Sequence, residues 1–275
     1  MIELPPPMWL PPRPAIIRPA DRELLKLARR DAIKASRREA SFLPGMFPAG
    51  AAAAFVDPDP PGLALAFIGS NQNLTNTANY SFASQPIGVA APTRRVVVVV
   101  GWVGTASTTN SISSATIGGV AATIHVQASD AAGGSRPGAG IISALVTTGP
   151  TATIAVNMTS ANCTLMTIEV FRQVKETAGS PHATVSDIVI ASGVFSTTIN
   201  IPATGTLVAG AIFGILIPVN ISFVGVTEDH ETASLESTFR SAAGHATGLG
   251  LQAGRTVSAT MTGGEDGALV AMSWG

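Results

Sequence analysis

The sequence predicts an all-β fold, an antiparallel β-sandwich with a jelly-roll-like body, preceded by an extended Pro-rich arm and one short helix. Three observations lead to this prediction: a run of five valines, a two-glycine turn between β-rich segments, and many short β-rich segments separated by Gly, Pro, Asn and Ser. Only 12% of the 275 residues are charged, so few charges would need desolvation when such bodies pack together.

The segment 94–127 organises the rest of the chain. It reads RRVVVVVGWVG, then a polar loop, then SISSATIGGVAATIHVQ. Consecutive valines are stiff at χ1 and fit a strand better than a helix, which predicts a strand over 95–103 that is buried on both faces. Gly118 and Gly119, between 112–117 and 120–126, predict a tight hairpin with positive φ at the turn.

The first nineteen residues are interrupted by prolines, which remove N–H donors and fix φ, so an extended arm is expected. Large apolar side chains lie in this arm and again in SFLPGMFPAG (41–50), where no local core could receive them. They favour a docking arm over the alternative, a disordered linker. The anchor candidates are Trp9, Leu10, Ile16, Ile17, Phe42 and Phe47.

Residues 21–40 have the one convincing helical pattern of the sequence, which predicts a helix with Asp21 as its N-cap and a basic polar face. Residues 1–50 contain nine Lys/Arg and five Asp/Glu, whereas the remainder contains seven and twelve. Acidic residues are interleaved with the basic ones, so a solvated helix is favoured over a nucleic-acid contact. A Pro-rich linker then places the domain boundary between 1–61 and 62–275.

From residue 62 onward no helical period is sustained, and about twelve to fourteen strands are expected. A long Gly-rich loop is expected over 130–140, and the absence of a repeat of fixed period argues against a solenoid or propeller. The expected strands are 63–68, 80–83, 95–103, the 112–126 hairpin, 140–147, 152–158, 164–174, 184–191, 194–201, 206–216, 221–227, 233–242, 256–262 and 268–274.

No motif in the sequence supports catalysis or a cofactor. The four histidines are dispersed, the lone Cys163 is expected to be a buried apolar residue, and no nucleophile elbow, P-loop or dinucleotide fingerprint is present. We therefore expect no catalytic residue, no metal and no cofactor. The densest acidic cluster of the β region is a weak candidate for a glycan or Ca²⁺ site, with a solvated turn as the favoured alternative: Glu228, Asp229 and Glu231.

The sequence shows no signal peptide and no apolar run approaching the ~20 residues that span a bilayer. The protein is therefore expected to be made and kept in a cytoplasm until something releases it, without a membrane partner.

The arm PPPMWLPPRPAIIRPA, the segment FLPGMFPAGAAAAF, the VVVVVGW strand, the TIGGVAAT hairpin and the terminal GALVAMSWG together resemble virion structural proteins of alphaproteobacterial tailed phages and prophages. The resemblance implies a capsid- or tail-attached component of the decoration or fibre type, assembled in the host cytoplasm. It implies that residues 1–50 bind other virion proteins, and a homo-oligomer, of which a trimer is one form, is expected. The alternatives are a tail adhesin module that binds a receptor or a host surface glycan and, less favoured, a glycan depolymerase.

Overall fold

The computed structural model describes residues 65–105, 110–130, 135–161, 163–174, 180–189, 193–215, 220–232 and 238–275. Within these ranges the chain forms seventeen β-strands and no helix, and the strands pair antiparallel. The all-β class and the antiparallel pairing were both predicted, although the number of strands is higher than expected. The predicted arm, helix and linker (1–61), with all six anchor candidates from Trp9 to Phe47, lie outside the described residues.

The first half of the β body forms two sheets. Sheet A has the order β1-β9-β3-β7-β6 and sheet B has the order β2-β8-β4-β5. The strand bounds are β1 (Leu65–Asn73), β2 (Asn79–Pro86), β3 (Arg95–Thr105), β4 (Ile112–Ile117), β5 (Val120–Ala121), β6 (Thr123–Ser129), β7 (Ser135–Leu145), β8 (Thr151–Met158) and β9 (Cys163–Gln173).

The second half forms two further sheets. Sheet C has the order β10-β17-β12-β15-β14, and sheet D has the order β11-β16-β13. The strand bounds are β10 (Ala183–Val189), β11 (Val194–Ile201), β12 (Gly205–Ile215), β13 (Ser222–Val224), β14 (Thr227–Glu231), β15 (Phe239–Leu249), β16 (Gln252–Thr260) and β17 (Gly264–Trp274).

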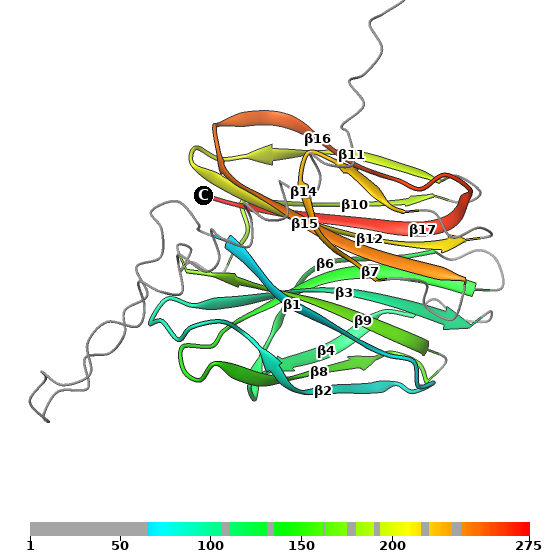
Figure 1. The fold of residues 1–275 in the computed structure, drawn as a ribbon, viewed down its shortest axis with the longest axis horizontal. Helices are drawn as coiled ribbons and strands as arrows, with labels where there is room; N and C mark the ends of the chain where they lie inside the picture. The colour runs from blue at the N-terminus through cyan, green and yellow to red at the C-terminus, as the bar shows by residue number, and fades with distance from the viewer. Residues whose placement is uncertain are drawn as a thin grey trace, which may run out of the picture. The chain divides into compact units, whose positions relative to one another are not determined.

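The four sheets stack in the order B, A, C, D (Figure 1). One apolar core lies between sheets B and A, a second between A and C, and a third between C and D. Sheets A and C are therefore covered on both faces by other sheets, and their strands need apolar side chains on both sides.

Strand β3 shows how the sequence meets this requirement. Val96, Val98 and Val100 contribute to the core between sheets B and A, whereas Val97 and Val99 contribute to the core between A and C. Successive side chains of a strand point to opposite faces, so an unbroken run of valines supplies both cores. The prediction of a strand buried on both faces is confirmed.

The two halves repeat one strand order. If β10 to β13 take the places of β1 to β4, and β14 to β17 those of β6 to β9, then β1-β9-β3-β7-β6 becomes β10-β17-β12-β15-β14. With the same correspondence of strands, the order β2-β8-β4 in sheet B becomes β11-β16-β13 in sheet D. The body therefore contains the same arrangement twice, in tandem along the chain.

Pairing register and short sequence matches agree on which residues are equivalent. The motif Arg-x-x-Ala-Gly recurs at 136–140 and 240–244, and Thr-x4-Met-Thr recurs at 153–159 and 256–262. The amide N–H groups of the two motif methionines donate to the carbonyl just before β2 and just before β11, respectively. The equivalent pairs include Val99 and Val208, Gly101 and Gly210, Ala139 and Ala243, Met158 and Met261, and Glu169 and Met272.

Sheets A and C pack face to face in a reciprocal manner. At one edge of the interface β7 packs against β17 and β6 against β10. At the other edge the equivalent strands exchange roles, because β9 contacts β15 through Glu169 and Ser241, and β1 contacts β14 through Ser70 and His230. Such reciprocity is the property of a two-fold dimer interface, here formed within one chain.

Two local predictions need correction. The turn at Gly118 and Gly119 has positive φ (59° and 78°) as expected, but the returning chain is divided: β5 pairs with β4, and β6 joins β7 in sheet A. Residues 135–140, expected within a Gly-rich loop, are the first half of β7. Gly138 leaves room for Trp102, because a Cβ on Gly138 would lie 2.4 Å from the Trp102 ring.

The close approach of sheets A and C gives the first testable prediction. A Cβ built on Gly210 would lie 2.1 Å from Val99 Cγ1, so Gly210→Ala should overpack the inner core and lower the free energy of unfolding by about 1–3 kcal/mol. Denaturant unfolding measures this loss.

The matched control is Gly250→Ala, where no atom of the described residues, apart from the two chain neighbours, lies within 4 Å of the added Cβ, and unchanged stability is expected. Adding Val99→Ala to Gly210→Ala should recover part of the loss, since the two side chains share one space. Simple additivity of the two substitutions would contradict the packing argument.

Candidate functional site

Polar side chains interrupt the core between sheets A and C along one edge, where β1 and β9 face β14 and β15. We call this group the polar edge; it comprises Ser70, Thr167, Glu169, Asp229, His230, Ser241 and His245. The rest of this core is apolar, with side chains such as Val99, Ile141 and Met272. The polar edge is thus a chemically distinct part of the inner core.

Glu169 lies at the centre of the polar edge and is only 1% exposed. The Ser241 hydroxyl donates a hydrogen bond of 2.7 Å to Glu169 Oε1, and Ser241 Oγ lies 2.9 Å from Thr167 Oγ1. Burial raises the pKa of Glu169 to about 7, and the Ser241 hydrogen bond opposes that rise. The side chain therefore titrates near neutral pH.

Two histidines flank this carboxyl group. His245 Nδ1 lies 2.6 Å from Asp229 Oδ2, and the His245 ring meets Phe171 edge to face. His230 Nε2 lies 2.9 Å from Ser70 Oγ, and its ring stacks on Phe67 with 5.8 Å between centroids. Each imidazole is thus positioned by one polar and one aromatic contact.

The Ser70–His230 pair does not have the proton arrangement of a hydrolytic serine. Burial lowers the pKa of His230, with Glu231 opposing the shift, so the ring is neutral at pH 7. Its Nδ1 is buried and has no hydrogen-bond partner among the residues that the structure describes, and an unpaired buried lone pair costs less than an unpaired buried N–H. The proton therefore belongs on Nε2, which donates to Ser70, whereas a catalytic serine donates to its histidine. This arrangement leaves the Ser70 hydroxyl hydrogen available to a ligand.

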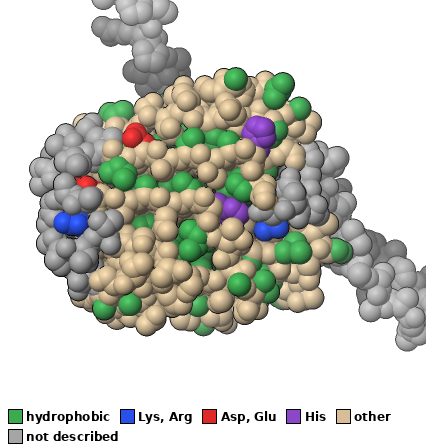
Figure 2. Space-filling model, turned by 180° about the vertical axis from the view of Figure 1, so that it is seen from behind, with side chains coloured by type: hydrophobic (Ala, Val, Ile, Leu, Met, Phe, Trp, Pro, Cys, Tyr) green, Lys and Arg blue, Asp and Glu red, His purple; other side chains and the backbone are tan. Residues whose placement is uncertain are grey.

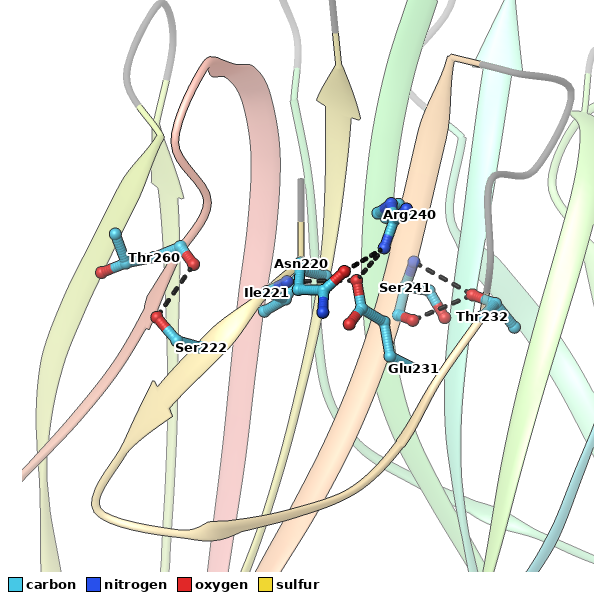
Figure 3. Close-up of polar contacts among 8 residues, drawn as sticks. All are labelled: Asn220, Ile221, Ser222, Glu231, Thr232, Arg240, Ser241 and Thr260. Atoms are coloured by element: carbon cyan, nitrogen blue, oxygen red, sulfur yellow. Dashed lines mark hydrogen bonds and ion pairs between the residues drawn. The ribbon is translucent and has the colours of Figure 1, made fainter. Parts of the chain in front are cut away.

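A hydrogen-bonded group next to this pair fixes the edge strand β14 (Figure 3). Glu231 Oε1 accepts hydrogen bonds from Arg240 Nη1 at 2.6 Å and from the Ile221 amide at 3.1 Å. Thr232 Oγ1 accepts from the Ser241 amide at 3.1 Å and donates to the Ser241 carbonyl at 2.9 Å. Strand β14 is thereby held against β15 beside the polar edge.

An open pocket of about 490 Å³ lies between β1 and β14. Its lining residues all have polar side chains: Ser70, Asn71, Gln72, His230, Glu231 and Thr232. Its volume falls within the range of roughly 300–1,000 Å³ that small-molecule sites occupy. The pocket and the polar edge share Ser70 and His230, so these two residues join the pocket to the buried polar cluster.

The predicted acidic cluster is not a converging ligand set. Strand β14 carries Glu228, Asp229 and Glu231, where a solvated turn was favoured, and a bulge separates Glu228 from His230. Asp229 pairs with His245 and Glu231 with Arg240, while burial and the two neighbouring carboxylates raise the pKa of Glu228. Among the described residues no group of three or more His, Cys, Asp or Glu could hold a metal ion, and no helix is long and apolar enough to cross a membrane.

Sequence reasoning did not identify Ser70, Glu169 or Ser241 as site residues. A signal was present for Glu169, because TLMTIEVF alternates and places its single charged residue on the same face as Leu165 and Phe171. A carboxyl group at an apolar position of a buried strand indicates a special local environment. The position of Ser70 opposite His230 had no such signal.

No protein-family model matches the chain, and no curated protein or solved structure shows a significant similarity to it.

Glu169 provides a prediction for pH dependence. Its pKa is about 7 in the folded chain and 4.5 as the ordinary value, so the folded state binds more protons between these two values. The free energy of unfolding should therefore fall as pH rises from 4.5 to 7, by on the order of 3 kcal/mol from this group. Glu169→Gln should abolish this component and be more stable than the parent above pH 7, as measured by urea unfolding across pH 4–8.

The other titrating groups are common to both proteins, so the difference between the two stability curves isolates Glu169. Ser241→Ala provides a second variant, because it removes the hydrogen bond that lowers the Glu169 pKa and should move the midpoint of the parent curve to higher pH. A constant stability difference between parent and Glu169→Gln at every pH would refute the assignment.

Proposed function

We propose that the chain is a structural component of a tailed-phage virion, of the capsid-decoration or tail-fibre type, which residues 1–50 anchor and whose β body faces outward. The observation that carries this proposal is the body itself: four stacked sheets enclose three apolar cores and present a charge-poor surface. Figure 2 shows one face on which charged side chains are few and well separated. Such a surface favours packing of copies, and we expect a homo-oligomer.

The finer fold assignment supports the same class. We infer that each half is a jelly roll, with β5 and β6 taken as one strand that changes sheets. The first half then has eight strands in the sheet orders 1-8-3-6-5 and 2-7-4-5, which is the jelly-roll connectivity with strand 5 shared between the two sheets, and the second half follows it without the β5 segment. Jelly rolls occur in viral capsid proteins and in lectins, so this fold suits both a structural and a glycan-binding role.

The arginines of the body give no support to a nucleic-acid partner. The Arg94 guanidinium donates to the carbonyls of Gly88, Val146 and Thr148 at 2.6–2.7 Å and is completely buried. Arg255 donates twice to one backbone carbonyl, and Arg240 pairs with Glu231. These side chains hold loops and strands together, which leaves other virion proteins as the favoured partners.

Glycan recognition is the second candidate function, and the polar pocket between β1 and β14 favours it. A depolymerase would need two carboxylates facing a groove, one as acid and one as base or nucleophile. Asp229 and Glu231 instead pair with His245 and Arg240, so binding without catalysis is the better-supported form of this candidate.

Particle association tests the main proposal. The full chain with Trp9→Ala and Leu10→Ala should no longer co-purify with virions, because the arm loses two large apolar anchors, while its thermal unfolding stays unchanged. Deletion of residues 1–50 should have the same effect on co-purification.

The control variant is Leu251→Ala, which removes a body side chain that is 79% exposed and should leave co-purification intact. Retention of the arm variants on particles, or loss of the control variant, would contradict anchoring by residues 1–50.

A further inference from the structure

The duplicated strand order supplies an internal comparison for the polar edge. When the pairing register of β3 with its two neighbours is compared with that of β12, five side chains of the polar edge have an apolar equivalent, whereas Ser70 corresponds to Thr184. The equivalences are Thr167 with Val270, Glu169 with Met272, Ser241 with Pro137, His245 with Ile141, and His230 with Ala128. A matching backbone hydrogen bond supports them, because Thr232 N donates to Ser241 O and Asp130 N donates to Pro137 O.

The two edges of the interface differ sharply in chemistry. Ala128, Ile141, Val270 and Met272 belong to the apolar core, and none is more than 8% exposed. Their equivalents at the other edge are an imidazole, a second imidazole, a hydroxyl and a carboxyl group. Because the same backbone arrangement accepts apolar side chains at these four positions, the fold does not require these four polar groups.

The polar groups also oppose stability. Burying the Glu169 carboxyl group raises its pKa, and the charged form is therefore disfavoured in the folded chain at pH values above that pKa. Residues that lower the stability of a protein and that its fold does not require are typical of functional positions. The difference between the two edges thus indicates a function at the polar edge, where the open pocket lies.

The groups in the pocket that remain available to a ligand are hydrogen-bonding and carry little net charge. Ser70 accepts from His230 and keeps its own hydroxyl hydrogen, and Gln72 is exposed with a side-chain amide that has no protein partner among the described residues. Glu231 uses Oε1 for Arg240, which balances its charge, and Oε2 has no partner within the described part of the chain. Asn71 is held by Gln85 and by the Gln72 amide.

We propose that this pocket binds a neutral saccharide unit through Ser70, Gln72 and Glu231, with His230 as the positioning residue that orients Ser70. A hydroxyl donor, an amide that both donates and accepts, and a charge-balanced carboxylate match the adjacent hydroxyl groups of a sugar ring. At the pocket itself the two edges differ at His230, whose equivalent is Ala128, whereas Ser70, Gln72 and Glu231 correspond to the polar residues Thr184, Ser186 and Ser129. The inference rests on the proposed outward display for its biological setting, but its chemistry is tested separately.

The probes are D-glucose, D-galactose, D-mannose, L-rhamnose and N-acetyl-D-glucosamine in saturation-transfer NMR with the full chain, together with an array of bacterial surface glycans. At least one probe is expected to bind. Ser70→Ala and Gln72→Ala should each weaken that binding about tenfold, because each removes one hydrogen bond to the ligand. His230→Gln should weaken it less, since it only releases Ser70.

The matched control is Ser129→Ala, which changes the equivalent of Glu231 at the apolar edge and should leave the affinity unchanged. Thermal unfolding of each variant establishes that the body is folded. Absence of binding by every probe, or binding that Ser70→Ala and Gln72→Ala leave intact, would overturn the proposal.

Particle co-purification of the same proteins separates the two functions. Pocket variants should remain on virions, and the Trp9→Ala/Leu10→Ala chain should still bind the sugar. Loss of sugar binding in that arm variant would refute a self-contained pocket, whereas loss of particle association in Ser70→Ala would contradict the separation of anchor and ligand site.

Discussion

The face-to-face packing of sheets A and C is the constraint on which the rest of this structure depends. Each of these sheets has another sheet on both of its faces, and no helix covers them in the described residues. Their central strands must therefore be apolar on both sides, which explains the valine run of β3. Their side chains must also be small where the two sheets approach each other closely, which explains why Gly210 lies opposite Val99. Small and branched side chains thus allow two sandwich-like halves to behave as one unit.

At one edge of the interface between sheets A and C, polar side chains stand in the otherwise apolar core, and this difference marks a candidate site. A buried carboxyl group, two imidazoles and two hydroxyls replace aliphatic side chains that the equivalent edge retains. The packed geometry can accommodate either set, so the polar set reflects a local requirement and not a need of the fold. The open pocket between β1 and β14 adjoins this set, and the strand that closes it is tied down by Glu231, Arg240 and Thr232.

Sequence patterns predicted individual strands well where one residue type dominated. The valine run in 95–103 corresponds to β3, and the alternation in 164–174 corresponds to β9. The glycine pair at 118–119 forms a turn with positive φ. The patterns failed at β14, where Glu228, Asp229 and Glu231 suggested a solvated turn, because a polar edge strand has no apolar face to reveal it. The duplication was also missed, since motifs as short as Arg-x-x-Ala-Gly and Thr-x4-Met-Thr do not form a repeat of fixed period.

The sequence by itself determined the all-β class, the position of the doubly buried central strand and the absence of recognisable catalytic motifs, because these depend on neighbouring residues along the chain. Only the tertiary structure decided which strands share a sheet and which side chains meet between sheets. Glu169 and Ser241 are 72 residues apart, and Ser70 and His230 are 160 apart. Contacts across stacked sheets join residues of unrelated sequence position, so no local pattern encodes them, and the polar edge becomes visible only when both halves of the body are packed together.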